Sequence, residues 1–105
     1  MHFTSFLESG QLTVALTGEI DHHCAKTYIQ AIASKIEAYT PQICILDFQE
    51  VSFLDSSGIA VVINALRSMT QIEGRLLLTG IARQPMRVFQ ASGIDKLVEI
   101  KEAVS

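Results

Sequence analysis

The run Ile43-Cys44-Ile45-Leu46-Asp47-Phe48 constrains the fold more than any other stretch of the sequence. It is rich in β-favouring residues, and segments with the apolar spacing of helices precede and follow it. A continuous apolar run of this kind is typical of a strand that is covered on both faces, as in a parallel sheet. We therefore expect residues 43–48 to form a central strand of an α/β sheet.

The segments before and after this strand carry apolar residues at spacings of three and four, which is typical of amphipathic helices. The spacing predicts a first helix over about 25–38, with Asp21 as a suitable N-cap nearby, and a second helix that opens at Asp55-Ser56-Ser57-Gly58, with Ser56 or Ser57 as its N-cap. The second helix is expected to bury a stripe of large residues, namely Ile59, Val62, Ile63, Leu66 and Met69. Its outer face would then be small and mildly apolar, and would be either covered by a loop or used as a docking surface: Ala60, Val61, Asn64, Ala65 and Ser68.

The two ends of the chain complete the predicted fold. Alternating residues around the turn Glu8-Ser9-Gly10 predict an N-terminal β-hairpin of residues 3–7 and 12–16. A strand at residues 76–78, a helix from Pro85 and a last strand at 97–100 follow. The sequence thus predicts one domain over residues 1–105, with a mixed sheet and helices packed on it.

Composition excludes several classes of function. The chain has 105 residues, a net charge of −3 and no cluster of basic residues, so nucleic-acid binding is not expected. The longest apolar runs are much shorter than the roughly 20 residues of a membrane helix, and the N-terminus does not resemble a signal peptide. We expect a cytoplasmic monomer without a membrane anchor. The glycines show no nucleotide-binding spacing, and no cofactor or metal is expected.

The serine pair Ser56-Ser57 is the most informative candidate site, because it places two hydroxyls and the Asp55 carboxylate at the start of a helix. Capping alone would explain one serine. The second serine and the following Gly58, expected to leave the backbone uncovered, favour contact with another macromolecule. A phosphate on this turn would be stabilised by the helix N-terminus, yet it would add roughly −1.5 to −2 charge beside Asp55 and repel a partner.

Two chemical alternatives compete with this interpretation. A serine hydrolase would need a Gly-x-Ser-x-Gly elbow and a late histidine, whereas the histidines are His2, His22 and His23. A metal site at His22-His23 would need further ligands, because adjacent side chains point in different directions. Neither alternative has the residues that its chemistry requires.

Two motifs, Leu16-Thr17-Gly18-Glu19-Ile20-Asp21-His22-His23 and Phe53-Leu54-Asp55-Ser56-Ser57-Gly58, resemble the anti-sigma factor antagonists, a family of STAS domains. Ala91-Ser92-Gly93-Ile94 resembles a third, weaker family segment, and the resemblance covers essentially the whole chain. The form Gly-Glu-Ile-Asp-His-His is most similar to the sporulation branch of the family, the stage II anti-anti-sigma factors.

The resemblance implies a partner-switching regulator of transcription. The unphosphorylated protein would bind an anti-sigma factor that is also a serine kinase and release the sigma factor. Phosphorylation of Ser56 would end binding, and a serine phosphatase would reset the switch. The expected partner surface comprises Asp21, Asp55, Ser57, Gly58 and Val61. The alternative is a STAS subunit of a transport or stress-signalling complex without phospho-switching.

Overall fold

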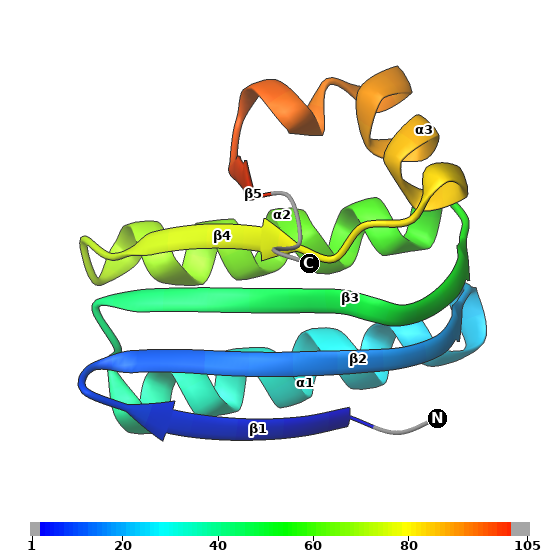
Figure 1. The fold of residues 1–105 in the computed structure, drawn as a ribbon. Coiled ribbons are helices and arrows are strands. Elements are labelled where there is room, and N and C mark those ends of the chain that lie inside the picture. The colour runs from blue at the N-terminus through cyan, green and yellow to red at the C-terminus, as the bar shows by residue number, and fades with distance from the viewer. Residues whose placement is uncertain (1–2, 102–105) are drawn as a thin grey trace.

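The computed structural model describes residues 3–101, which form a single α/β domain (Figure 1). Its elements, in chain order, are β1 (Phe3–Glu8), β2 (Gln11–Ile20), α1 (His22–Tyr39), β3 (Ile43–Leu54), α2 (Ser56–Gln71), β4 (Arg75–Thr79), α3 (Arg83–Ser92), the 3₁₀ helix η1 (Ile94–Lys96) and β5 (Glu99–Lys101). The predicted fold class is confirmed.

The five strands form one mixed sheet in the order β1-β2-β3-β4-β5. β1 pairs antiparallel with β2, and the remaining neighbours are parallel. Ser9 and Gly10 close the hairpin with φ values of 52° and 77°, the left-handed conformation that tight hairpin turns need. The predicted hairpin and the central position of the strand that begins at Ile43 are both confirmed.

β3 differs from its prediction in length and in covering. It continues to Leu54, because register shifts in its pairing with β2 keep the two strands together up to the pair Ile20 and Leu54. The prediction that both of its faces are covered is wrong: Cys44, Leu46 and Phe48 are buried, whereas the residues between them are half-exposed. Apolar residues on the half-exposed face concealed this alternation.

Helix α2 also packs differently from its prediction. Val61 and Ala65 are buried, with 1% and 2% of their surface exposed, so they do not lie on an outer face. Ile59 and Ile63, which were expected inside, are only half-buried. Val62 and Met69 are buried as predicted, so the buried face of α2 overlaps the predicted stripe but is rotated toward the small residues.

The remaining boundaries shift by a few residues. α1 begins at His22, α3 begins at Arg83, and the last strand begins at Glu99 because η1 is followed by a turn at residues 97–98.

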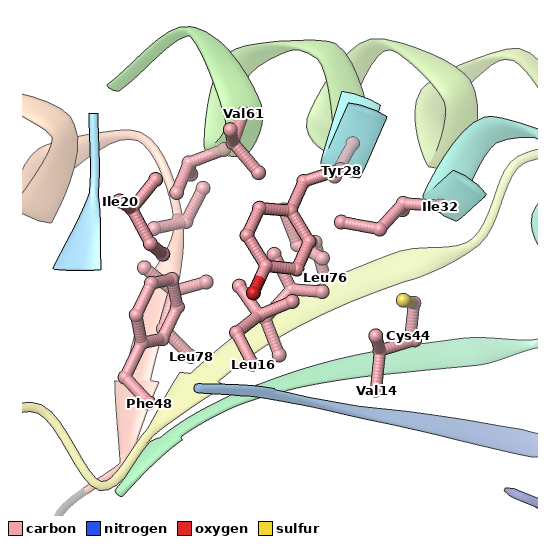
Figure 2. Close-up of a cluster of buried hydrophobic side chains, with 14 of the residues drawn as sticks. Val14, Leu16, Ile20, Tyr28, Ile32, Cys44, Phe48, Val61, Leu76 and Leu78 are labelled. Atoms are coloured by element: carbon pink, nitrogen blue, oxygen red, sulfur yellow. The ribbon is translucent and has the colours of Figure 1, made fainter. Parts of the chain in front are cut away.

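The core lies between one face of the sheet and the helices. α1 and α2 lie side by side behind the strands (Figure 1) and contact each other along their length. Figure 2 shows Tyr28 and Ile32 of α1 and Val61 of α2 directed at residues of the sheet. The hydroxyl of Tyr28 donates to the carbonyl oxygen of Thr17 at 3.1 Å. Over residues 3–101, no helix has the length and apolar character needed to cross a membrane.

Candidate functional site

Two strand-to-helix turns lie next to each other at the carboxyl ends of the neighbouring strands β2 and β3. Ile20, the last residue of β2, pairs with Leu54, the last residue of β3, and the backbone N–H of Asp55 donates to the carbonyl oxygen of Ile20 at 3.1 Å. Asp21 and Asp55 directly follow the paired residues, and each is the N-cap of the helix that comes next. The topology therefore brings together the two motifs that are far apart in the sequence, at the strand ends where α/β sheets usually place function.

Asp55 is the N-cap of α2. Its Oδ1 accepts a hydrogen bond from the backbone N–H of Ser57 at 2.7 Å, and its backbone is extended. The prediction that Ser56 or Ser57 would be the cap is wrong, because the carboxylate one residue earlier already reaches the first-turn N–H group. The serine hydroxyls therefore have no capping task.

Ser56 is the first residue of α2, and its side chain is exposed. Within residues 3–101, its hydroxyl makes no hydrogen bond with another part of the protein. Ser57 is half-buried beside it. Of the two hydroxyls, that of Ser56 is the more accessible to another protein.

Gly58 is buried, so the expectation of an uncovered backbone at this position is wrong. A Cβ atom at Gly58 would lie 2.3, 2.5 and 2.9 Å from the Cγ, Cδ1 and Cδ2 atoms of Leu54. Glycine is needed here because the first turn of α2 packs directly on the end of β3. The expectation of an accessible Val61 side chain is equally wrong, since it lies inside the core one turn later.

Asp21 caps α1, as predicted, and its Oδ1 accepts from the backbone N–H of His23 at 3.0 Å. Partial desolvation acts to raise the pKa of Asp21. The backbone N–H and the charge of His23, together with the backbone N–H and thiol of Cys24, outweigh this effect and place the pKa below its ordinary value of 3.8. The carboxylate is therefore ionised at neutral pH. It lies next to the turn Asp55-Ser56-Ser57 (the serine turn).

The side chains that follow Asp21 do not form a metal-binding cluster in the described part of the chain. The rings of His22 and His23 are exposed, with their centroids 4.0 Å apart. No three His, Cys, Asp or Glu side chains gather into a possible metal site within residues 3–101. The thiol of Cys24 donates to the carbonyl oxygen of Glu19 at 3.4 Å. His2 lies outside the described residues.

Gln84 is a site residue that the sequence did not reveal. Its Oε1 accepts from the backbone N–H of Leu54, and its Nε2 donates to the carbonyl oxygen of Leu54, both at 2.9 Å. These bonds connect the first turn of α3 to the residue before Asp55. No local signal could have identified Gln84, because it is 30 residues away from Leu54.

The sequence of the chain matches a known domain family and curated proteins over most of its length. The profile of the STAS domain matches residues 7–105. The chain is 29% identical over 97 residues to the anti-sigma-B factor antagonist of Listeria monocytogenes, covering 90% of this chain and 82% of the relative. It is 30% identical over 95 residues to the anti-sigma F factor antagonist of Lysinibacillus sphaericus, covering 90% and 81%.

Solved structures agree with the sequence relatives. The unphosphorylated form of the anti-sigma factor antagonist SpoIIAA superposes with a TM-score of 0.85 at 27% identity, covering 99% of this chain and 90% of that one. The phosphorylated form of SpoIIAA, described as a Bacillus cell fate determinant, superposes with a TM-score of 0.77 at the same identity, covering 99% and 93%.

Proposed function

Because the chain belongs to the STAS domain family, we propose that it is an anti-sigma factor antagonist, a regulatory binding protein and not an enzyme. In its unphosphorylated form it binds an anti-sigma factor that is also a serine kinase, and so releases the sigma factor. Phosphorylation of Ser56 ends this binding, and a serine phosphatase restores it. One observation carries the proposal: the hydroxyl of Ser56 is exposed at the start of α2, directly after the carboxylate that caps the helix.

A phosphate on Ser56 is compatible with the folded domain. The side chain is exposed, so no packed group has to move to make room. The N-terminus of α2 also favours an anion, because unpaired N–H groups and the positive end of the helix dipole lie there. Phosphorylation should therefore leave the fold intact.

The same phosphate is unfavourable for a partner that binds the unmodified surface. It adds roughly −1.5 to −2 charge next to the carboxylates of Asp55 and Asp21. A partner that fits a neutral serine would bury the phosphate beside these carboxylates without a cation to pair with it, so like-charge repulsion among the three groups and the cost of desolvating the phosphate both oppose binding. This difference between folding and binding is what a switch requires.

The proposed partner surface consists of Asp21, Asp55, Ser56 and Ser57. Gly58 and Val61 contribute from beneath it, by allowing α2 to pack closely on β3 and the core. We place the protein in the cytoplasm as a one-domain regulator. Control of sporulation stays a prediction, because the relatives include antagonists named for both sigma-B and sigma-F circuits.

Mass spectrometry tests the proposal directly. The protein is incubated with ATP and the kinase-like anti-sigma factor encoded in its own genomic neighbourhood, and the site of any phosphate is mapped. We expect phosphate on Ser56 and none on the variant Ser56→Ala, which still binds the anti-sigma factor. If wild-type protein binds no anti-sigma factor and carries no phosphate, the proposal is wrong, and a STAS subunit of a transport or stress-signalling complex becomes the better explanation.

A further inference from the structure

Gln84 occupies a place in the sheet where a strand would otherwise be. The last pair between β3 and β4 joins Asp47 to Thr79, so β4 does not accompany the far end of β3. At Leu54 the amide side chain of Gln84 supplies both missing contacts, one to the backbone N–H and one to the carbonyl oxygen, each at 2.9 Å. A primary amide has the same donor and acceptor groups as a peptide unit, and here it replaces one.

Leu54 is consequently restrained by contacts with β2, with α3 and with the first turn of α2. Ile20 of β2 pairs with Leu54 on one side of β3, and Gln84 bonds to the Leu54 backbone on the other side. The side chain of Leu54 is fully buried against Gly58. The next residue, Asp55, is fixed by its own N–H bond to Ile20. These restraints define where α2 begins, and hence where the hydroxyl of Ser56 stands.

Gln84 can act as a fixed support because α3 is itself anchored. Phe89 of α3 is fully buried and packs edge-to-face on Phe48 of β3, with ring centroids 5.5 Å apart. Pro85, next to Gln84, is also buried. A helix that is packed on the core therefore carries the amide.

We propose that Gln84 is a positioning residue for the turn Leu54-Asp55-Ser56. Through Gln84, α3 fixes the position of the Ser56 hydroxyl that the partner kinase phosphorylates; this inference rests on the proposed function. Phosphoryl transfer depends on alignment of the attacking oxygen with the transferred group, so a turn with more freedom presents the hydroxyl less often in the productive geometry. Gln84 acts through Leu54 and Asp55 and need not touch the kinase.

Two substitutions and a matched control test the inference. Gln84→Met keeps the length of the side chain but removes both hydrogen bonds, and Gln84→Glu keeps the acceptor for the Leu54 N–H but loses the donor at neutral pH. Gln90→Met is the control, because Gln90 is an exposed residue of the same helix and its side chain makes no hydrogen bond in the described residues. Amide hydrogen exchange at Leu54 is compared with exchange at Leu46 of the same strand, and kcat/KM for Ser56 phosphorylation is measured with the anti-sigma factor kinase.

We expect Gln84→Met to accelerate exchange at Leu54 at least about fivefold, as the loss of one net hydrogen bond implies, while exchange at Leu46 stays within about twofold. Phosphorylation of Ser56 should slow about tenfold, with Gln84→Glu between Gln84→Met and the control. Equal acceleration at Leu54 and Leu46 would mean general destabilisation and would overturn the inference. So would faster exchange at Leu54 with an unchanged phosphorylation rate.

The exchange measurement also separates this inference from the proposed function. If wild-type Ser56 accepted no phosphate, the proposed function would fail. The part of the inference that concerns phosphorylation would fail with it. Selective loosening of Leu54 in Gln84→Met would then still establish the support of the turn. If wild-type Ser56 were phosphorylated and Gln84→Met matched Gln90→Met in both measurements, only the inference would fail.

Discussion

Asp55 and Ser56 divide two tasks at the start of α2: Asp55 caps the helix and Ser56 presents a hydroxyl to solvent. The oxygen of a serine that caps a helix is engaged by a backbone N–H group, which leaves it less available for modification. Here the carboxylate of Asp55 takes the cap at 2.7 Å, so the exposed hydroxyl of Ser56 can be modified without loss of the helix start. The carboxylate that caps the helix is also the charge that repels the phosphate when both are buried against a partner.

The cap can be tested by substituting Asp55. Asp55→Ala should lower the free energy of unfolding by about 1 kcal/mol, because it leaves the N–H of Ser57 without its acceptor, whereas Asp55→Asn should cost only a few tenths. Urea denaturation measures both values. Ser56→Ala serves as the control and should be close to neutral. A cost for Asp55→Ala no larger than that of Ser56→Ala would contradict the cap assignment.

The charge effect can be tested by substituting Ser56. Ser56→Asp should weaken binding of the anti-sigma factor about tenfold, because it adds a negative charge beside Asp55 on the proposed partner surface. Ser34→Asp adds the same charge at an exposed position in the second half of α1 and should leave affinity unchanged. Isothermal titration calorimetry measures both. Equal affinities of Ser56→Asp and wild type would contradict the electrostatic explanation.

At the scale of elements, α2 is placed by its small residues. Gly58, Val61 and Ala65 recur at helical spacing and are buried, as are Val62 and Met69; α2 runs close to α1, and its first turn packs on Leu54 at the end of β3. Larger residues such as Ile59 lie at the sides of the contact and are only half-buried. The start of α2 therefore follows the end of β3 closely, and the serine turn has little room to move.

This close approach makes Gly58 sensitive to a single added methyl group. Gly58→Ala should lower the free energy of unfolding by about 1–3 kcal/mol, because its Cβ would lie within 3 Å of three Leu54 carbons. Adding Leu54→Val removes part of the obstructing side chain, so the double variant should lose less than the sum of the single variants. A double-mutant cycle measured by chemical denaturation gives this coupling. Additive effects would contradict a direct clash.

At the scale of the whole molecule, the sheet has one buried face and one half-exposed face. α1 and α2 pack on the buried face (Figure 1), and Cys44, near the start of β3, is fully buried on it (Figure 2). Burial raises the pKa of the Cys44 thiol from 9.0 to about 12, because ionisation would place a charge among apolar side chains. Ionisation of the Cys44 thiol at alkaline pH should therefore favour the unfolded chain.

Cys44 should make the domain less stable as the pH rises from 9 to 12. In this range the unfolded chain loses the thiol proton before the folded protein does, so stability is complete below pH 9 and falls up to the folded pKa. The loss approaches about 4 kcal/mol across the range. Cys44→Val has no proton to lose and is the control. Denaturation at pH 8, 10 and 11 should show a steeper decline for wild type; parallel declines would contradict the prediction.

Local patterns in the sequence were sufficient for the elements and for the motif. Periodicity predicted the hairpin, the first two helices and a central strand, because amphipathic spacing and turn residues act over a few neighbouring positions. Asp21 as a cap could be predicted for the same reason. The residue types at Asp55-Ser56-Ser57-Gly58 and their resemblance to a family are enough to indicate a site there, without the contact between Ile20 and Leu54.

The tertiary structure decided which residues surround that turn. Capping by Asp55, burial of Gly58 and Val61, the half-exposed face of the sheet and the support by Gln84 all depend on contacts between segments that are distant in the chain or on the exact backbone angle at a junction. Spacing along a sequence carries no information on such contacts. The sequence determined that a serine would open α2; packing determined that its hydroxyl would be exposed.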